Sequence, residues 1–183
     1  MKRSIIFVGL ALSLFAAAPA FAQNAPAAPV AAQGGFRRTP PTPAQASGNL
    51  SRVLVGPGGA GKSTLFEHLV AARVPGRRPR EGEHERSVGV DVAAVESGGL
   101  TVNLIDTPGY PDFVGELRAG LRAADAAIFV ISGADGIDGA TALLWQECSA
   151  VGMPRIIAVS KLDMPRSDYA ETIATCRRVF GDA

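Results

Sequence analysis

Cysteine is scarce in this 183-residue chain, and neither sign of charge is in excess. Two cysteines are too few for a disulfide-stabilised scaffold. Lys and Arg number 18, Asp and Glu number 17, and the net charge is +1. This balance excludes a strongly basic nucleic-acid-binding protein and an acidic disordered chain. The length fits one domain of ordinary size with a tail.

Acidic residues are missing from the first 50 positions, which carry only the basic residues Lys2, Arg3, Arg37 and Arg38. Residues 51–183 hold the other 14 basic residues and all 17 acids, a net charge of −3. The near-neutral total therefore averages two different kinds of sequence.

Residues 1–22 have the pattern of a secretory signal peptide. Two basic residues precede an apolar run over residues 5–18, and Ala20-Phe21-Ala22 is a typical cleavage tripeptide. A membrane anchor is disfavoured because the run of 14 residues is shorter than the roughly 20 that span a bilayer. We expect export to the periplasm or beyond, with no stable membrane insertion after cleavage.

Residues 23–49 are rich in Ala and Pro and contain no acid. Such a segment has too little apolar surface to fold, so it predicts a disordered, extended tether. The third segment, residues 50–183, is predicted to be the folded domain.

The third segment alternates apolar strands with helical stretches, which predicts an α/β fold with a mostly parallel sheet and helices on both faces. Two strands, around residues 88–92 and 100–105, are expected to form a hairpin. Strands are also predicted at residues 52–55, 126–131 and 155–159, and helices at 62–72, 112–123, 140–151 and 168–180. In such sheets ligands bind at the carboxyl ends of the strands.

A glycine-rich loop lies between the first predicted strand and helix. Its sequence, Gly56-Pro57-Gly58-Gly59-Ala60-Gly61-Lys62-Ser63, fits the P-loop pattern, and Thr64 follows it. Backbone N–H groups of such a loop point at phosphate oxygens. Lys62 is expected to reach the β- and γ-phosphates and Ser63 to coordinate Mg²⁺. The alternative is a glycine-rich turn with a chance lysine.

Two further loops follow predicted parallel strands. In Asp106-Thr107-Pro108-Gly109, Asp106 is expected to hold Mg²⁺ and the Gly109 N–H to contact the γ-phosphate. In Ser160-Lys161-Leu162-Asp163, Asp163 can accept two hydrogen bonds from guanine but meets a lone pair on adenine. Lys161 is expected to pack along the phosphate loop and the base. Each loop alone is also compatible with an ordinary solvated turn.

Together these motifs, and the continuous run from Asn103 to Ala126, resemble the front of the GTP-binding domain of a translational GTPase, closest to the bacterial elongation factor G-like proteins. The resemblance covers residues 51–183 and implies a P-loop NTPase fold. It also implies GTP/GDP and Mg²⁺ as ligands, ribosome-stimulated hydrolysis and a cytoplasmic place of work. That compartment conflicts with the export predicted from residues 1–22. We expect the chain to be a monomer.

The sequence departs from this family at three functional positions. The first switch has Arg86-Ser87-Val88-Gly89 where a Mg²⁺-binding Thr is usual, so a nucleotide-dependent clasp is in question. Tyr110 replaces the catalytic His; a phenol is a poor base at neutral pH but can orient a water, which predicts slow hydrolysis. Ser160 replaces an Asn whose amide helps to brace the site.

The chain also stops before the sixth strand and second guanine-contacting loop of the family, so we expect an incomplete domain from a fragment or a fusion product. Two functions follow as hypotheses: a slow Mg²⁺-dependent GTPase, or a hydrolysis-deficient nucleotide-binding fragment without a role in translation. Cys148 and Cys176, both on predicted helices, are expected to be buried thiols rather than a disulfide.

Overall fold

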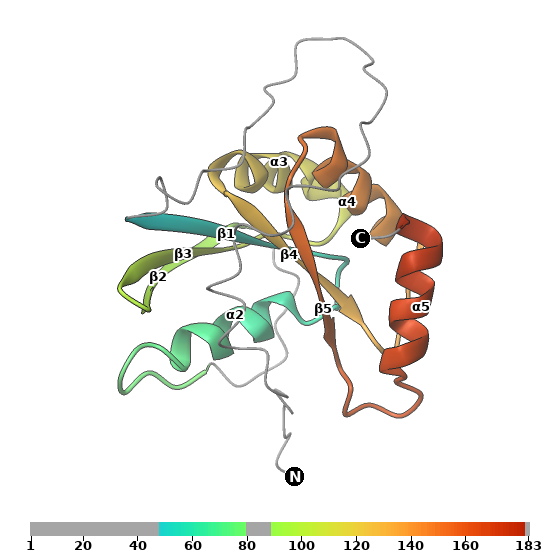
Figure 1. Cartoon of the computed structure of the whole chain (residues 1–183), viewed down its shortest axis with the longest axis horizontal. Helices are drawn as coiled ribbons and strands as arrows, with labels where there is room; N and C mark the ends of the chain where they lie inside the picture. The colour runs from blue at the N-terminus through green and yellow to red at the C-terminus, as the bar shows by residue number, and fades with distance from the viewer. Residues whose placement is uncertain (1–47, 80–88, 182–183) are drawn as a thin grey trace.

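The structure is a computed structural model that describes residues 48–79 and 89–181 (Figure 1). The predicted signal peptide, nearly all of the predicted tether and the first-switch residues Arg86, Ser87 and Val88 lie outside the described residues. Within the described part of the chain, no helix is long and apolar enough to cross a membrane.

One five-stranded sheet forms the centre of the domain, in the order β2-β3-β1-β4-β5. β1 pairs in parallel with β3 and β4, and β4 pairs in parallel with β5. β2 and β3 pair antiparallel, so the predicted hairpin and the mostly parallel sheet are confirmed, but β2 begins at residue 91 and ends at residue 97 rather than running over residues 88–92. The strands are β1 (Asn49–Val55), β2 (Asp91–Ser97), β3 (Leu100–Asp106), β4 (Ala126–Ser132) and β5 (Arg155–Ser160).

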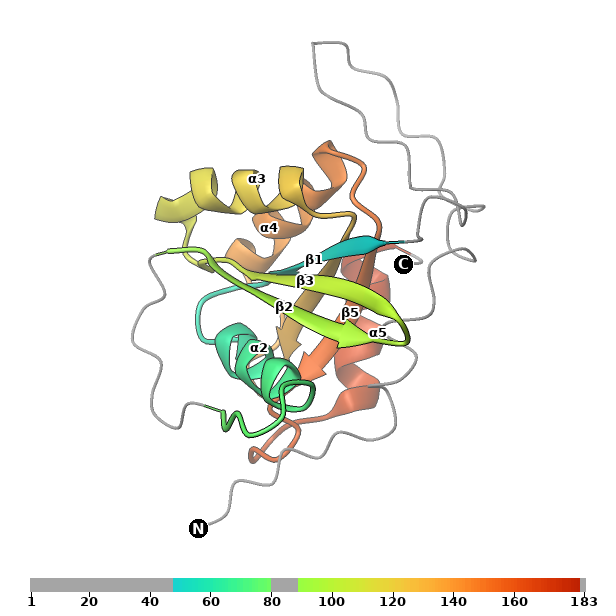
Figure 2. The same cartoon turned by 90° about the vertical axis from the view of Figure 1, so that its left-hand side faces the viewer.

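Helices cover both faces of the sheet, as Figures 1 and 2 show, with α2 on one face and α3, α4 and α5 on the other. They are α2 (Lys62–Ala71), α3 (Val114–Ala123), α4 (Gly139–Ala150) and α5 (Tyr169–Phe180). The helix predicted from Asp112 instead starts as a 3-10 turn, η3 (Pro111–Phe113). Phe113 has φ −107° and ψ 30°, outside the helical range, so the α-helix begins one residue later.

Local sequence explains where two of the helices begin. At α4, the Asp138 carboxylate accepts a hydrogen bond from the Thr141 backbone N–H at 2.7 Å, and the Thr141 hydroxyl faces the Asp138 N–H in return. At α5, Asp168 accepts from the Glu171 N–H at 2.9 Å. These caps satisfy N–H groups that have no partner within the helix.

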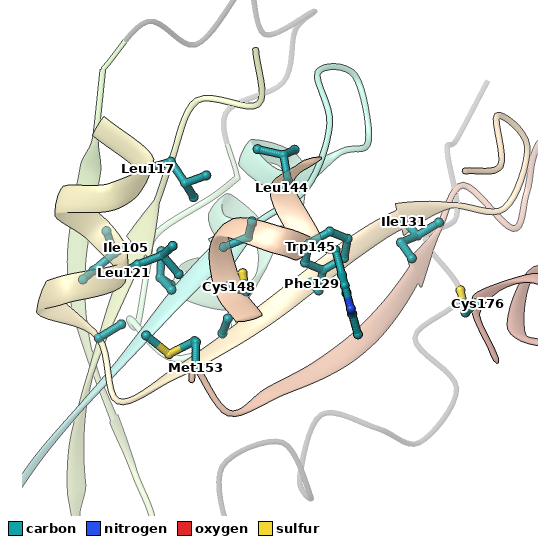
Figure 3. Close-up of a cluster of buried hydrophobic side chains, with 14 residues drawn as sticks. Ile105, Leu117, Leu121, Phe129, Ile131, Leu144, Trp145, Cys148, Met153 and Cys176 are labelled. Atoms are coloured by element: carbon teal, nitrogen blue, oxygen red, sulfur yellow. The ribbon is translucent and has the colours of Figure 1, made fainter. Parts of the chain in front are cut away.

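Two apolar layers hold the helices to the sheet, and β4 contributes to both because its side chains alternate between faces. In the layer under α3, α4 and α5, the Trp145 ring meets the edge of the Phe129 ring, with ring centroids 5.1 Å apart (Figure 3). On α5, the Phe180 ring stacks on Trp145 with ring centroids 4.2 Å apart. The layer under α2 consists mainly of Leu54, Phe66, Leu69, Val70, Val95, Val102, Leu104, Ile128 and Val130. Trp145 is therefore a core residue.

Both cysteines are buried free thiols, as expected from the sequence. Figure 3 shows Cys148 on α4 and Cys176 on α5, well apart in the same core layer. Burial raises the pKa of the Cys148 thiol to about 11, so this group stays protonated at neutral pH.

The sheet places four strand ends at one edge, because β1, β3, β4 and β5 run in the same direction. β1 and β3 lie inside the sheet, whereas β5 has a strand neighbour on one side only among the described residues. The loops after these four strands carry the candidate functional residues.

Candidate functional site

The loop between β1 and α2 is shaped by glycines that no other residue would replace easily. A side chain at Gly56, where φ is +153°, would strike the backbone oxygen of Val130 on β4. Gly61 is left-handed, with φ +86°, and is the residue from which α2 starts. The loop therefore leaves β1 pressed against β4 and turns directly into the N-terminal end of a helix, where anions bind. Thr64 lies in the first turn of that helix, and its carbonyl oxygen contacts Nδ1 of His68 at 2.8 Å.

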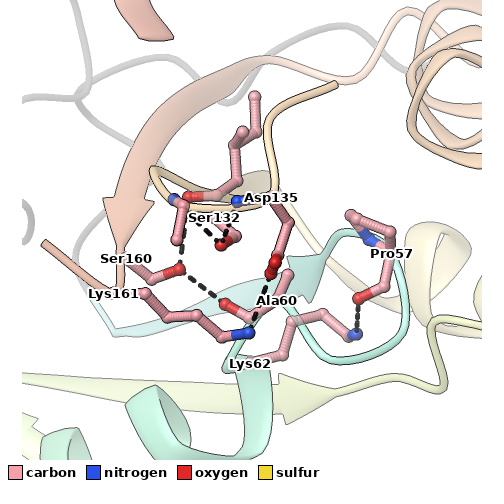
Figure 4. Close-up of polar contacts among 9 residues, drawn as sticks. Pro57, Ala60, Lys62, Ser132, Asp135, Ser160 and Lys161 are labelled. Atoms are coloured by element: carbon pink, nitrogen blue, oxygen red, sulfur yellow. Dashed lines mark hydrogen bonds and ion pairs between the residues drawn. The ribbon is translucent and has the colours of Figure 1, made fainter. Parts of the chain in front are cut away.

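Lys62 is buried inside this loop, with 6% of its surface exposed. Its ammonium donates a hydrogen bond to the carbonyl oxygen of Pro57 at 3.0 Å, so the side chain folds back over the loop (Figure 4). Burial lowers the pKa of Lys62 to about 8, and the nearby charge of Asp106 opposes this shift. A phosphate bound in the loop would place a further negative charge beside the buried ammonium and so stabilise its charged form.

Asp106 and Ser63 meet beside Lys62. The Ser63 hydroxyl donates to Oδ2 of Asp106 at 2.5 Å, and Asp106 is 1% exposed. The register of the sheet places Asp106 at the end of β3 opposite Leu54 of β1. The Thr107 hydroxyl then ties the following loop to the Leu54 carbonyl at 2.7 Å.

The hydroxyl and carboxylate at this point are oxygen ligands of the kind that Mg²⁺ takes, so the donor set fits this ion. Among the described residues, no group of three or more His, Cys, Asp and Glu side chains could hold a metal by itself. A divalent ion at Ser63 and Asp106 would therefore share its coordination with other oxygens, such as those of phosphate.

Gly109 and Tyr110 pack against the glycine-rich loop. A side chain on Gly109 would collide with the Lys62 ammonium and with the backbone at Gly56 and Pro57, so the Gly109 backbone lies against the loop. A Cβ on Gly58 would come within 2.7 Å of the Tyr110 ring. The aromatic ring of Tyr110 thus occupies the space that a side chain at Gly58 would need.

Ser160 connects the end of β5 to the glycine-rich loop. Its hydroxyl donates to the carbonyl oxygen of Ala60 at 2.6 Å and lies 3.2 Å from the carbonyl oxygen of Ile131 (Figure 4). A hydroxyl has one hydrogen, so the shorter contact to Ala60 is the main bond. The bracing expected to be lost with the Asn amide is therefore supplied in part by Ser160.

Lys161 and Asp163 lie on the loop after β5. Lys161 has a left-handed backbone, with φ +55°, and its ammonium bonds Oδ2 of Asp135 at 2.8 Å. Its ammonium is thus held by the loop after β4, a contact that the sequence did not predict. Asp163 is exposed at the surface, where its carboxylate is accessible to a ligand.

Two further residues of the site, Ser132 and Asp135, belong to none of the sequence motifs. They lie at the end of strand β4 and in the loop that follows it, at the same edge of the sheet. Their position at the end of a buried strand was the available indication, since that is where ligands bind in α/β sheets. The site therefore draws on the ends of four strands.

Comparison with known proteins agrees with this arrangement. The family model of the elongation factor Tu GTP binding domain matches residues 49–182. An elongation factor G-like protein of Mycobacterium tuberculosis is 46% identical over 175 residues, covering 87% of this chain and 23% of that protein. The chain thus spans about a quarter of the length of this relative.

Solved structures show the same fold. A protein of Thermus thermophilus matches with a TM-score of 0.66 and 33% identity, over 72% of this chain and 22% of its own. Translation elongation factor SelB of Methanococcus maripaludis, solved with the GTP analogue GppNHp, matches with a TM-score of 0.57 and 17% identity, over 78% of this chain and 26% of its own. At 17% identity the second likeness shows the fold alone.

The family match extends over most of the chain and over every strand and helix described above. The chain belongs to the translational GTPases and contains a GTP-binding domain of the elongation factor Tu type, similar to that of an elongation factor G-like protein.

Proposed function

We propose that the domain binds GTP and GDP together with Mg²⁺ and hydrolyses GTP slowly. The observation that carries the proposal is the loop Gly56–Ser63, which encloses a buried Lys62 beside the Ser63–Asp106 pair. A lysine buried at the N-terminal end of a helix with a lowered pKa is suited to a polyphosphate, which restores the charge balance on binding.

Three groups would contact the phosphates. The loop N–H groups cradle the α- and β-phosphates, and the Lys62 ammonium exchanges the Pro57 carbonyl for β- and γ-phosphate oxygens. The Gly109 backbone lies against the loop, and its N–H would donate to the γ-phosphate. Ser63 and Asp106 would hold Mg²⁺, which neutralises charge on the phosphates when bound.

Guanine would be recognised by the loop after β5. The Asp163 carboxylate accepts from two guanine N–H donors, while the Lys161 side chain lies beside the base and Ser160 fixes the adjoining phosphate loop. Adenine presents an acceptor to Asp163 instead of a donor, and such a mismatch lowers affinity strongly.

Hydrolysis needs a water aligned with the γ-phosphate, and Tyr110 follows Gly109 directly, with its ring against the phosphate loop. A neutral phenol orients water by hydrogen bonding but removes a proton poorly at neutral pH. Since positioning supplies much of the catalysis in phosphoryl transfer, the expected outcome is slow turnover rather than none.

Binding is tested with fluorescent GDP on the full 183-residue chain, with unlabelled GTP, ATP and xanthosine diphosphate as competitors. GTP should compete and ATP should not. In Asp163→Asn, the new amide donates to the C2 carbonyl of xanthine and no longer accepts two guanine N–H bonds, so preference should move from guanine to xanthine. Equal binding of ATP and GTP would contradict the proposal.

Turnover is tested by phosphate release with and without Mg²⁺. Tyr110→His should raise the rate, because imidazole is a better base near neutral pH. Lys62→Ala, in which the phosphate contact is lost, serves as the background control. GTP binding without any turnover would favour the hydrolysis-deficient alternative, and an unchanged rate in Tyr110→His would remove Tyr110 from the mechanism.

For the whole protein, we propose the ribosome as partner, which the family membership supports. Residues 1–22 are proposed as a secretory leader and residues 23–49 as a tether on the sequence pattern alone. N-terminal sequencing of the expressed protein, together with its cell fraction, tests both: a start at Gln23 outside the cytoplasm would contradict a ribosomal role.

A further inference from the structure

We propose that Asp135 is a positioning residue of the guanine pocket, which acts by holding the side chain of Lys161 in place before the base binds. The proposal rests on the proposed function, since it concerns the same nucleotide site. Neither the family motifs nor the sequence pattern assigned a role to Asp135.

The central observation is the contact between the two side chains. The Lys161 ammonium lies 2.8 Å from Oδ2 of Asp135, although the residues are 26 positions apart and follow different strands (Figure 4). The Lys161 side chain is 33% exposed and the Asp135 side chain 65%. The Lys161 side chain therefore bridges from the end of β5 to the loop after β4.

The loop that carries Asp135 is itself fixed to the sheet. The Ser132 hydroxyl accepts hydrogen bonds from the N–H groups of Asp135 at 3.1 Å and Ala134 at 3.3 Å. The Gly133 N–H donates to the Ser160 carbonyl at 2.9 Å, which joins this loop to β5. Lys161 and Ser132 both lower the pKa of Asp135, so its carboxylate is ionised at neutral pH.

This arrangement has a direct consequence for a base bound by Asp163. Lys161 and Asp163 lie in one tight turn, in which the Met164 N–H donates to the Lys161 carbonyl at 3.1 Å. We therefore expect a base held by Asp163 to lie close to the Lys161 side chain. A free lysine side chain loses rotamer freedom when a ligand packs on it, which weakens binding. Asp135 removes part of that freedom in advance, and the left-handed backbone of Lys161 is a second sign of a fixed conformation.

The size of the effect follows from the exposure of the pair. Ion pairs at the surface contribute modestly because water screens them. We therefore expect Asp135→Asn to raise the dissociation rate of GDP by about two- to fivefold. Affinity for inorganic pyrophosphate, which lacks a base, should stay the same or become tighter, because a negative charge has been removed nearby.

The experiment compares GDP release and pyrophosphate competition in the full chain and in Asp135→Asn, Lys161→Gln and the double variant. Glu147→Gln is the matched control, since Glu147 forms a similar surface ion pair with Arg118, at 2.7 Å, between α3 and α4. Thermal melting of each nucleotide-free protein checks that the fold is unchanged.

The proposal is supported if GDP release is faster in Asp135→Asn while pyrophosphate binding is retained, and if Asp135→Asn has no additional effect in the Lys161→Gln background. Unchanged or slower release, an equal loss of pyrophosphate binding, or the same change in Glu147→Gln overturns it. A wild-type chain that binds no nucleotide would contradict the proposed function as well, whereas a wild-type chain that binds GDP with unchanged release in Asp135→Asn contradicts only this inference.

Discussion

The buried lysine of the phosphate loop predicts that GDP binding takes up a proton above neutral pH. In the empty site the pKa of Lys62 is lowered to about 8 by burial. Bound phosphates favour the charged form and move this pKa back toward 10.5, the ordinary value. Binding should therefore take up about half a proton at pH 8 and nearly one at pH 9, and GDP affinity should fall about tenfold between pH 7 and pH 9.

The same group has the opposite effect on folding. The pKa of Lys62 is lower in the folded chain than in the unfolded one, so between about pH 8 and pH 10.5 the unfolded chain binds more protons. The free energy of unfolding of the nucleotide-free protein should then rise with pH in this window. Below about pH 8 both states carry the proton, and Lys62 contributes no slope.

Calorimetric titration with GDP in two buffers of different ionisation enthalpy counts the protons taken up, and thermal melts of the empty protein give the stability slope. Lys62→Met removes the titrating group, so the difference between wild type and this variant isolates its contribution. No proton uptake at about pH 8.5, or parallel rather than opposite slopes for affinity and stability, would refute the assignment of these effects to Lys62.

Three further outcomes are expected. Ser160→Ala should weaken GDP binding about three- to tenfold, because the Ala60 carbonyl loses its donor, whereas Ser160→Asn should bind at least as well as wild type; fluorescent GDP titration decides this. Gly58→Ala should lower GTP turnover about tenfold or more, with a smaller effect on GDP affinity, because the new methyl group displaces the Tyr110 ring. The control Gly139→Ala adds a methyl group in open space and should change neither turnover nor affinity. Leu54→Ala should lower the free energy of unfolding by about 2–5 kcal/mol in chemical denaturation, because Leu54 is fully buried in the layer under α2.

Local patterns predicted most of the fold. The alternation of apolar strands and helical stretches indicated the five strands and four α-helices of the described residues, because strands such as β4 are continuous apolar runs bounded by turns. All except β2 lie within three positions of the predicted bounds, whereas β2 was expected near residues 88–92 and runs over Asp91–Ser97, and the 3-10 turn η3 was not expected. The start of α3 was predicted two residues too early. Residues 111–113 form a 3-10 turn, which the sequence pattern does not distinguish from the first turn of an α-helix.

The candidate site was predictable where its residues are neighbours in sequence. The loop from Gly56 to Ser63 is one motif, and the strand ends point to Asp106 and Asp163. The contacts of Ser160 with Ala60, 100 residues away, and of Lys161 with Asp135 depend on which strands are adjacent in the sheet. Strand order determines these pairs, and a single sequence does not encode it in any local pattern.

The position of the strands within the sheet divides the nucleotide site into two halves of different local stability. The phosphate half is carried by β1 and β3, each hydrogen-bonded on both sides, whereas the guanine half follows β5, which has a strand neighbour on one side only among the described residues. Amides of β5 should accordingly exchange with deuterium faster than those of β1, and bound guanine nucleotide should protect them. Nucleotide release is then expected to begin with local opening around the base while the diphosphate is still held.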